Sequence, residues 1–191
     1  MKKALFKETI SYFKKNNEQI FVQFKEGNVN LSDGHIICTM PIEYYETFII
    51  PKLAGFPRYT QDETMVMYKA HDNRLEWSNV DFSSFYNQIG EQIKGDVTPI
   101  LIDVNKGTLR AITWMYGEMK AVLVNDWFYE ISKEYTDGTY LCSSENAPVV
   151  TGNGDFKFMM LPVSRKSGTD EINYFNMIMK ALNTEKTEQA A

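Results

Sequence analysis

The feature that most constrains the fold of this chain is an internal rhythm, in which an amphipathic helix pattern is followed by two or three strand patterns. The rhythm occurs in four successive stretches: 1–40, 41–79, 80–124 and 125–165. A repeat of about 40 residues indicates an architecture of similar units, because each unit buries its apolar face against its neighbours. We therefore expect an α+β fold of repeated helix-plus-antiparallel-strand units.

The third stretch carries the clearest signals. Asp81 is a suitable N-cap residue for a helix. Apolar residues then follow with helical spacing, namely Phe82, Phe85, Tyr86, Ile89 and Ile93. Strand patterns come next at 99–104, 108–116 and 119–124, with turn residues between them. This stretch predicts a helix that packs on an antiparallel meander.

The pattern changes after Arg165. A polar linker at 166–169 precedes a helix pattern with apolar residues at Ile172, Phe175, Met179 and Leu182. This helix lies outside the repeat, and we expect it to close a sheet edge or to dock on another subunit. The expected organisation is a half-size domain at 1–79, a second domain at 80–165, and a linker, C-terminal helix and tail at 166–191.

Composition limits the possible environments. With 43% hydrophobic residues in 191, the chain has enough apolar side chains for a sizeable core, while a net charge of −5 disfavours a surface uniformly adapted to nucleic acid or anionic membrane. No window approaches 18 uncharged apolar residues, and no signal-peptide pattern is present, so we expect a cytoplasmic protein without a membrane span. Cys38 and Cys142 fall in apolar strand patterns, which favours buried reduced thiols over a disulfide.

Motifs for catalysis or metal binding are lacking in the sequence. The two histidines, His35 and His71, lie beside turn residues, and neither CxxC nor HxxxH spacing occurs. Ser143 and Ser144 lack the glycines of a nucleophile elbow, and Gly-Lys-Ser/Thr never occurs. We therefore predict no catalytic residue, no metal ligand and no cofactor.

Two further clusters have an ordinary structural interpretation. Asp126, Glu130 and Glu134 are four residues apart and would share a helix face, where a solvated surface is favoured over an acid/base or metal cluster. The aromatic residues include Trp77, Trp114 and Trp127, and most of the aromatic residues fall at core-facing positions of the expected helices and strands. Core packing is therefore favoured over stacking on nucleic-acid bases.

The first helix pattern, at 3–15, has a basic face. Its polar side carries Lys3, Lys7, Lys14 and Lys15. Such a face suits contact with phosphates, but an ordinary solvated helix face has the same composition. Both interpretations stay open on this pattern alone.

The second half of the chain has an ordered series of segments: a helix from Asp81, strands in 98–104, 107–113 and 120–124, the segment Val-Asn-Asp-Trp-Phe at 124–128, the apolar Pro-Val strand at 146–150, and Phe-Met-Met-Leu-Pro-Val-Ser-Arg at 158–165. This series resembles one domain of a DNA sliding clamp, the polymerase processivity factor. The last segment resembles the closing strand of bacterial clamps, with Leu161 in place of Met and Ser164 inserted before Arg165. The first 80 residues resemble the family only in topology.

The resemblance implies a non-enzymatic function in DNA replication. Helices would line a central hole around double-stranded DNA and contact it without sequence specificity. This implies Lys3, Lys7, Lys14, Lys15, Lys94 and Lys133 as DNA-facing residues. The family's partner cleft implies Met160, Leu161, Pro162 and Val163 as residues that bind a DNA polymerase or another replication protein. The short chain would have to form a homo-oligomeric ring, and such shortened forms are typical of phages and mobile elements.

Two other functions are compatible with the same sequence. One is a protein-binding adaptor or inhibitor, from a phage or mobile element, that has no DNA affinity. It would use a sheet edge or the C-terminal helix. The other is an enzyme with a dispersed acid/base site, which the scarcity of histidine disfavours.

Overall fold

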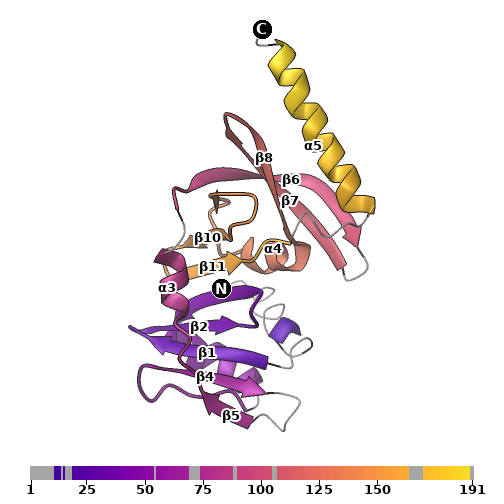
Figure 1. Cartoon of the computed structure of the whole chain (residues 1–191). Coiled ribbons are helices and arrows are strands. Elements are labelled where there is room, and N and C mark those ends of the chain that lie inside the picture. The colour runs from indigo at the N-terminus through magenta and orange to yellow at the C-terminus, as the bar shows by residue number, and fades with distance from the viewer. Residues whose placement is uncertain are drawn as a thin grey trace. The chain divides into compact units, whose positions relative to one another are not determined.

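The structure, a computed structural model, describes residues 11–13, 15, 19–53, 55–68, 74–87, 90–104, 107–163 and 170–189 (Figure 1). These residues form mostly antiparallel strands with a few helices, which is an α+β fold. Contacts divide the chain into two compact units. Unit 1 contains Met1–Gln88, Ile131–Asp137 and Thr151–Met159, and unit 2 contains Ile89–Glu130, Gly138–Val150 and Met160–Ala191. The domains expected at 1–79 and 80–165, and the fourfold repeat, stay predictions.

Unit 1 is built on antiparallel strands in the order β5-β4-β1-β2-β3-β11. Their bounds are β1 (Gln19–Lys25), β2 (Asn28–Ser32), β3 (Ile36–Pro41), β4 (Glu63–Tyr68), β5 (Arg74–Trp77) and β11 (Phe156–Met160). The alternation of Ile20, Val22 and Phe24 in β1 predicts a half-buried strand, and all three side chains are buried. The hairpins and their turns follow the sequence pattern closely.

The helical segment after β3 is irregular. It starts as α2 (Ile42–Tyr44), continues as the π-helix η1 (Tyr45–Ile49) and ends as the 3-10 helix η2 (Ile50–Lys52). Pro51 lies within η2 and has no amide hydrogen to donate to the preceding turn, so the regular helical bonding changes at this point. Tyr45 and Ile49 are buried on the same sheet face as Phe24, whose ring meets Tyr45 edge-on at 5.7 Å between centroids.

The helix expected from Asp81 to Ile93 is shorter than predicted. The described part, α3, spans Phe82–Asn87, and Ile93 is the first residue of β6 (Ile93–Val104). The placement of Ile93 on the helix is therefore wrong. Ile93 pairs with Cys142 of β9 (Tyr140–Cys142), so strand pairing overrides the local helical periodicity here.

Unit 2 has the strand order β9-β6-β7-β8. β7 spans Gly107–Tyr116 and β8 spans Glu118–Asn125, and β6 has an irregular register between Val97 and Leu101, around Pro99. α4 (Asp126–Ser132) follows β8 directly, and the Asn125 side-chain oxygen caps it by accepting the Trp127 N–H at 3.0 Å. β10 (Val149–Asn153) begins in unit 2 and forms a hairpin with β11.

The chain ends in a 20-residue helix, α5 (Asp170–Gln189), which lies against β8 and β6 of unit 2 (Figure 1). Its buried residues Ile172, Phe175 and Met179 match the apolar positions of the sequence pattern. No helix in the described ranges is both long and apolar enough to cross a membrane.

Candidate functional site

The predicted DNA-facing lysines fall into two groups. Lys3, Lys7 and Lys14 lie outside the described residues. Lys15, Lys94 and Lys133 are described and exposed. Lys94 lies on strand β6 and Lys133 directly after α4, so neither is on a helix. The assignment of all six to DNA stays a prediction.

The predicted partner-binding segment follows directly from β11. Met160 is fully buried, Leu161 is 41% exposed, and Pro162 and Val163 are half-buried. The Val163 N–H donates to the Leu123 carbonyl of β8 at 2.8 Å. This segment therefore offers one exposed apolar side chain, while its end is bound to the edge of the unit 2 sheet.

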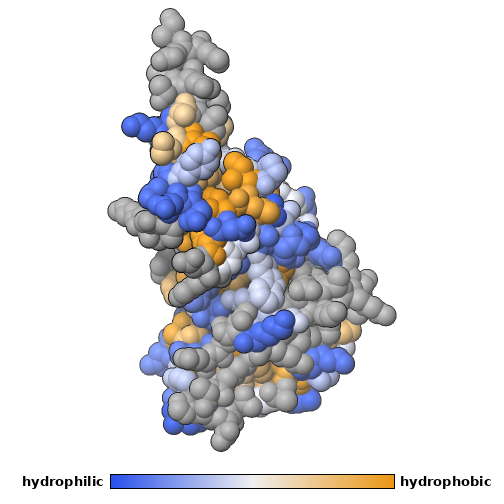
Figure 2. All heavy atoms as spheres, turned by 90° about the vertical axis from the view of Figure 1, so that its right-hand side faces the viewer, coloured by the Kyte–Doolittle hydropathy of each residue, from blue (hydrophilic) through white to orange (hydrophobic). Residues whose placement is uncertain are grey.

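An apolar cluster lies between α5 and the face of β6, β7 and β8. Its buried members are Ile102, Leu109, Ala111, Ala121, Leu123, Ile172, Phe175 and Met179. Val163 packs against this cluster. The residues that the resemblance assigns to a partner thus adjoin a surface that α5 covers. On its outer side α5 exposes Tyr174 and Met177, and Figure 2 shows hydrophobic side chains gathered beside this helix.

Asn183 of α5 binds the backbone of β8 in the way that a neighbouring strand does. The Met119 N–H donates to Asn183 Oδ1 at 2.8 Å, and Asn183 Nδ2 donates to the Met119 carbonyl at 3.0 Å. Together with Val163 on Leu123, this contact covers two positions of the outer edge of β8. Sequence reasoning missed Asn183, because a single asparagine on the polar side of a helix gives no signal of such a contact.

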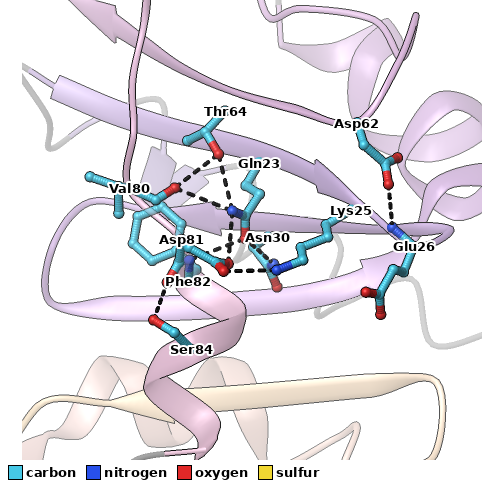
Figure 3. A network of polar contacts seen from close by, with 10 residues as sticks. All are labelled: Gln23, Lys25, Glu26, Asn30, Asp62, Thr64, Val80, Asp81, Phe82 and Ser84. Atoms are coloured by element: carbon cyan, nitrogen blue, oxygen red, sulfur yellow. Dashed lines mark hydrogen bonds and ion pairs between the residues drawn. The ribbon is translucent and has the colours of Figure 1, made fainter.

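Unit 1 contains a buried polar network under α3 (Figure 3). Gln23 of β1 is its centre and is only 4% exposed. Its Nε2 lies 3.0 Å from Thr64 Oγ1 and 3.2 Å from both the Val80 carbonyl and Asp81 Oδ1. Its Oε1 accepts hydrogen bonds from Asn30 Nδ2 and the Phe82 N–H, at 2.9 and 3.1 Å.

The network extends to an ion pair at one end and a tyrosine at the other. Lys25 Nζ donates to Asp81 Oδ2 at 2.7 Å, and this bond raises the pKa of Lys25. In the other direction, Thr39 links Asn30 to the Tyr86 hydroxyl, and burial raises the pKa of Tyr86. Because these contacts join strands β1 to β4 to the start of α3, the network holds that helix on the sheet. The network consists of amides, hydroxyls and one ion pair that bond to one another, so we assign it a structural role.

The edge strand β5 exposes large apolar side chains. Trp77 is 69% exposed and Leu75 is 41% exposed, so Trp77 is an exception to the core packing that is expected of most aromatic residues. Alternation in a strand indicates which residues share a face, but it does not indicate whether that strand is central or at an edge. Trp114, in contrast, lies on the central strand β7 and is buried.

The remaining candidate groups have structural environments. Both cysteines are buried and free, and burial raises the pKa of the Cys142 thiol to about 12. Asp126 pairs with Arg110, whose guanidinium lies 4.3 Å from the Tyr129 ring centroid. Glu134 lies beyond the end of α4, so the three acidic residues do not share one helix face. Within the described ranges, His, Cys, Asp and Glu form no group that is suited to a metal ion.

Comparisons with known proteins show a weak likeness to solved structures. No family model and no curated protein matches this chain. Its fold is similar to a crystal structure described as a candidate DNA polymerase III beta subunit from Eubacterium rectale, with a TM-score of 0.39 and 14% identity. The match covers 83% of this chain and 63% of that one, so this chain spans less than two thirds of its length. The likeness does not establish membership of that family.

Proposed function

We propose that this protein is a non-enzymatic DNA-replication accessory protein of the sliding-clamp type. In this role it would bind double-stranded DNA without sequence preference, and a DNA polymerase or another replication protein. The proposal keeps the homo-oligomer and the two clamp-like domains, 1–79 and 80–165, that the sequence resemblance implies. A cytoplasmic location is part of the same proposal.

The observation that carries the proposal is the order of helices and strands along the chain around the predicted partner-binding segment. The resemblance implies a helix directly after the strand at 120–124, then an apolar strand, then a closing strand that ends near Pro162. α4 starts at Asp126, β10 at Val149, and β11 ends at Met160. Leu161, at the end of that strand, is exposed and apolar, which suits a partner-binding residue.

DNA contact would depend on a local basic face, because the whole chain has a net charge of −5. The exposed side chain of Lys15 suits contact with phosphates. Such contacts carry no sequence information and weaken as salt rises, because bound counterions are released from the DNA.

A second candidate function is a protein-binding adaptor or inhibitor without DNA affinity. The exposed Trp77 and Leu75 on the edge strand β5 favour it. Exposed aromatic side chains are enriched at protein interfaces, and edge strands bind extended segments of other chains.

The two candidates are separated by DNA binding at several salt concentrations. A nicked circular plasmid is the probe, because a protein that encircles DNA slides off open ends. The test variant is Lys14→Glu/Lys15→Glu, and the control is Lys52→Glu/Lys157→Glu, which alters the net charge equally at exposed lysines outside the predicted set. We expect the test variant to lose at least about tenfold in affinity and to reduce the salt slope by roughly 2, with little change in the control.

Two results would contradict this proposal. Equal loss in both variants would show a general charge effect and remove the DNA-facing assignment. Absence of DNA binding by the unmodified protein, together with recovery of one specific protein partner, would favour the adaptor.

A further inference from the structure

One hydrogen-bonding side of the β5 backbone faces away from β4. β5 pairs antiparallel with β4, with Val66 opposite Glu76 and Met67 opposite Leu75, and no other described strand pairs with it. The Ser78 N–H donates to the Thr64 carbonyl at 2.9 Å, which extends the same register. Since hydrogen-bonded and non-hydrogen-bonded pairs alternate, Glu76 points its amide and carbonyl toward β4, whereas Leu75 and Trp77 point theirs away.

The side chains of this edge lie on two faces of different character. Leu75 and Trp77 share one face and are 41% and 69% exposed. Arg74 and Glu76 lie on the other face, within 2.7 Å of each other, and their side chains are 60% and 43% exposed. Natural sheets protect an edge by a cover, a proline, a bulge, a short strand or charged side chains. The described residues of β5 carry no proline, bulge or cover, but β5 has only four residues and includes the charged Arg74 and Glu76, so pairing at this edge depends on a partner that matches these charges.

The charge order along β5 is self-complementary. In an antiparallel pair centred on Leu75, Arg74 lies opposite Glu76 of the partner subunit, and Glu76 lies opposite the partner's Arg74. We infer that β5 pairs in this register with β5 of a second copy of the chain, across a twofold axis.

This register uses the outward backbone groups of Leu75 and the charges beside them. Leu75 points its amide and carbonyl outward, so two opposed copies of Leu75 exchange both hydrogen bonds. Arg74 and the partner's Glu76 then form a non-hydrogen-bonded pair, the type in which opposed side chains are closest. Trp77 lies diagonally opposite the partner's Leu75 on the same face of the sheet, within reach of a large side chain, and this contact reduces the exposure of both.

Charge separates the chosen register from its alternative. Centring the pair on Glu76 would set Leu75 opposite the partner's Trp77 and also pair the outward backbone groups, but it places two carboxylates directly opposite each other, which is destabilising. An extended peptide from another protein would form the same backbone hydrogen bonds. It would complement Arg74 and Glu76 only if it had opposite charges at the matching positions, whereas a second copy of β5 always has them. The inference goes beyond the proposed function, because this pairing needs no DNA, and its test does not involve DNA.

The test reverses the charges at positions 74 and 76 and measures the solution mass by light scattering after size exclusion. The chain is measured from about 1 to about 200 micromolar, because self-association depends on protomer concentration. We expect a dimer whose dissociation constant rises at least about tenfold in Arg74→Glu and in Glu76→Arg, since each places like charges opposite each other at two symmetric positions. The double variant Arg74→Glu/Glu76→Arg restores the opposite-charge pairs and should restore the dimer.

Mixing the two single variants sharpens the test. In the mixed pair each glutamate faces an arginine, so a heterodimer forms although each variant alone is monomeric. Circular dichroism checks that each variant is folded. A monomer throughout the concentration range, a dimer that neither charge reversal weakens, or a monomer that instead binds an extended peptide would each overturn the inference.

Discussion

The edge strands β8 and β5 differ in whether other described residues bind the backbone groups on their outer sides. On β8, Asn183 binds both the amide and the carbonyl of Met119, and the Val163 N–H binds the Leu123 carbonyl. On β5, Leu75 and Trp77 direct their backbone groups outward, and their side chains are exposed. One edge is covered by residues of its own unit, and the other is available to another chain.

The difference lies in the segment that follows β11, which binds one edge of the unit 2 sheet. An exposed strand edge is a template for pairing with any other strand, so a sheet with two such edges promotes open-ended aggregation. The segment that follows β11 closes the edge of β8, and the same segment covers the apolar face beside it. Pairing through β5 gives a closed dimer, because a twofold interface uses up the surface that forms it, and a ring around DNA would require a second contact elsewhere on the chain.

The largest expected change in the free energy of unfolding comes from disrupting the packing of α5 on the unit 2 sheet. Phe175 is buried in the cluster under α5, whereas its neighbour Tyr174 is 66% exposed. We expect Phe175→Ala to lower the free energy of unfolding by about 3–5 kcal/mol, because it leaves a cavity in that cluster. Tyr174→Ala, the matched control, should change it by less than about 0.5 kcal/mol. Urea unfolding, followed by circular dichroism, measures both.

The outcome also tells whether α5 is an integral part of unit 2. If Phe175→Ala and Tyr174→Ala have equally small effects, α5 adds little to the stability of the sheet, and the comparison of a closed edge with an open one fails.

Much of the fold could be predicted from the sequence, because local patterns determine it. Alternating apolar residues gave the strands of unit 1, as Ile20, Val22 and Phe24 illustrate, and glycine-containing turns gave the hairpins. The helical spacing of Phe175 and Met179 gave the buried side of α5. These patterns report which side of an element is apolar, and burial follows whenever that side meets another element.

The candidate sites depend on the arrangement of elements, which local patterns do not contain. Gln23 and Thr64 alternate with apolar residues and therefore suggest a solvent-facing side, but α3 and residue Asp81 cover them. Trp77 has the pattern of a core residue, but β5 has a neighbour on one side only. Ile93 fits the helical spacing, yet pairing with β9 places it in a strand. In each case a long-range contact decides the outcome.

A smaller effect tests the cover of the β8 edge. Asn183→Ala removes both hydrogen bonds to Met119, and we expect a loss of about 1–2 kcal/mol. Asn173→Ala is the matched control, since it makes the same change at an exposed position of the same helix. Hydrogen exchange gives the local readout, and the Met119 amide should exchange faster in Asn183→Ala alone. Unchanged protection of that amide would mean that another group covers it.

The smallest expected change in stability concerns the open edge. Proline has no amide hydrogen, so its effect on a strand depends on the direction in which the replaced amide points. The Leu75 amide points away from β4, and we expect Leu75→Pro to alter the free energy of unfolding by less than about 0.5 kcal/mol. Glu76→Pro, one residue further on, removes a bond to β4 and should destabilise unit 1 by about 3 kcal/mol or more. Urea unfolding of the two variants therefore determines the direction of each amide independently of any association.

If Leu75→Pro is as destabilising as Glu76→Pro, the Leu75 amide is bonded within the fold, and β5 is a closed edge like β8. If Leu75→Pro retains the stability of the unmodified chain but is monomeric, the outward side of Leu75 serves association, because proline then removes the amide hydrogen and the leucine side chain that a second copy would contact.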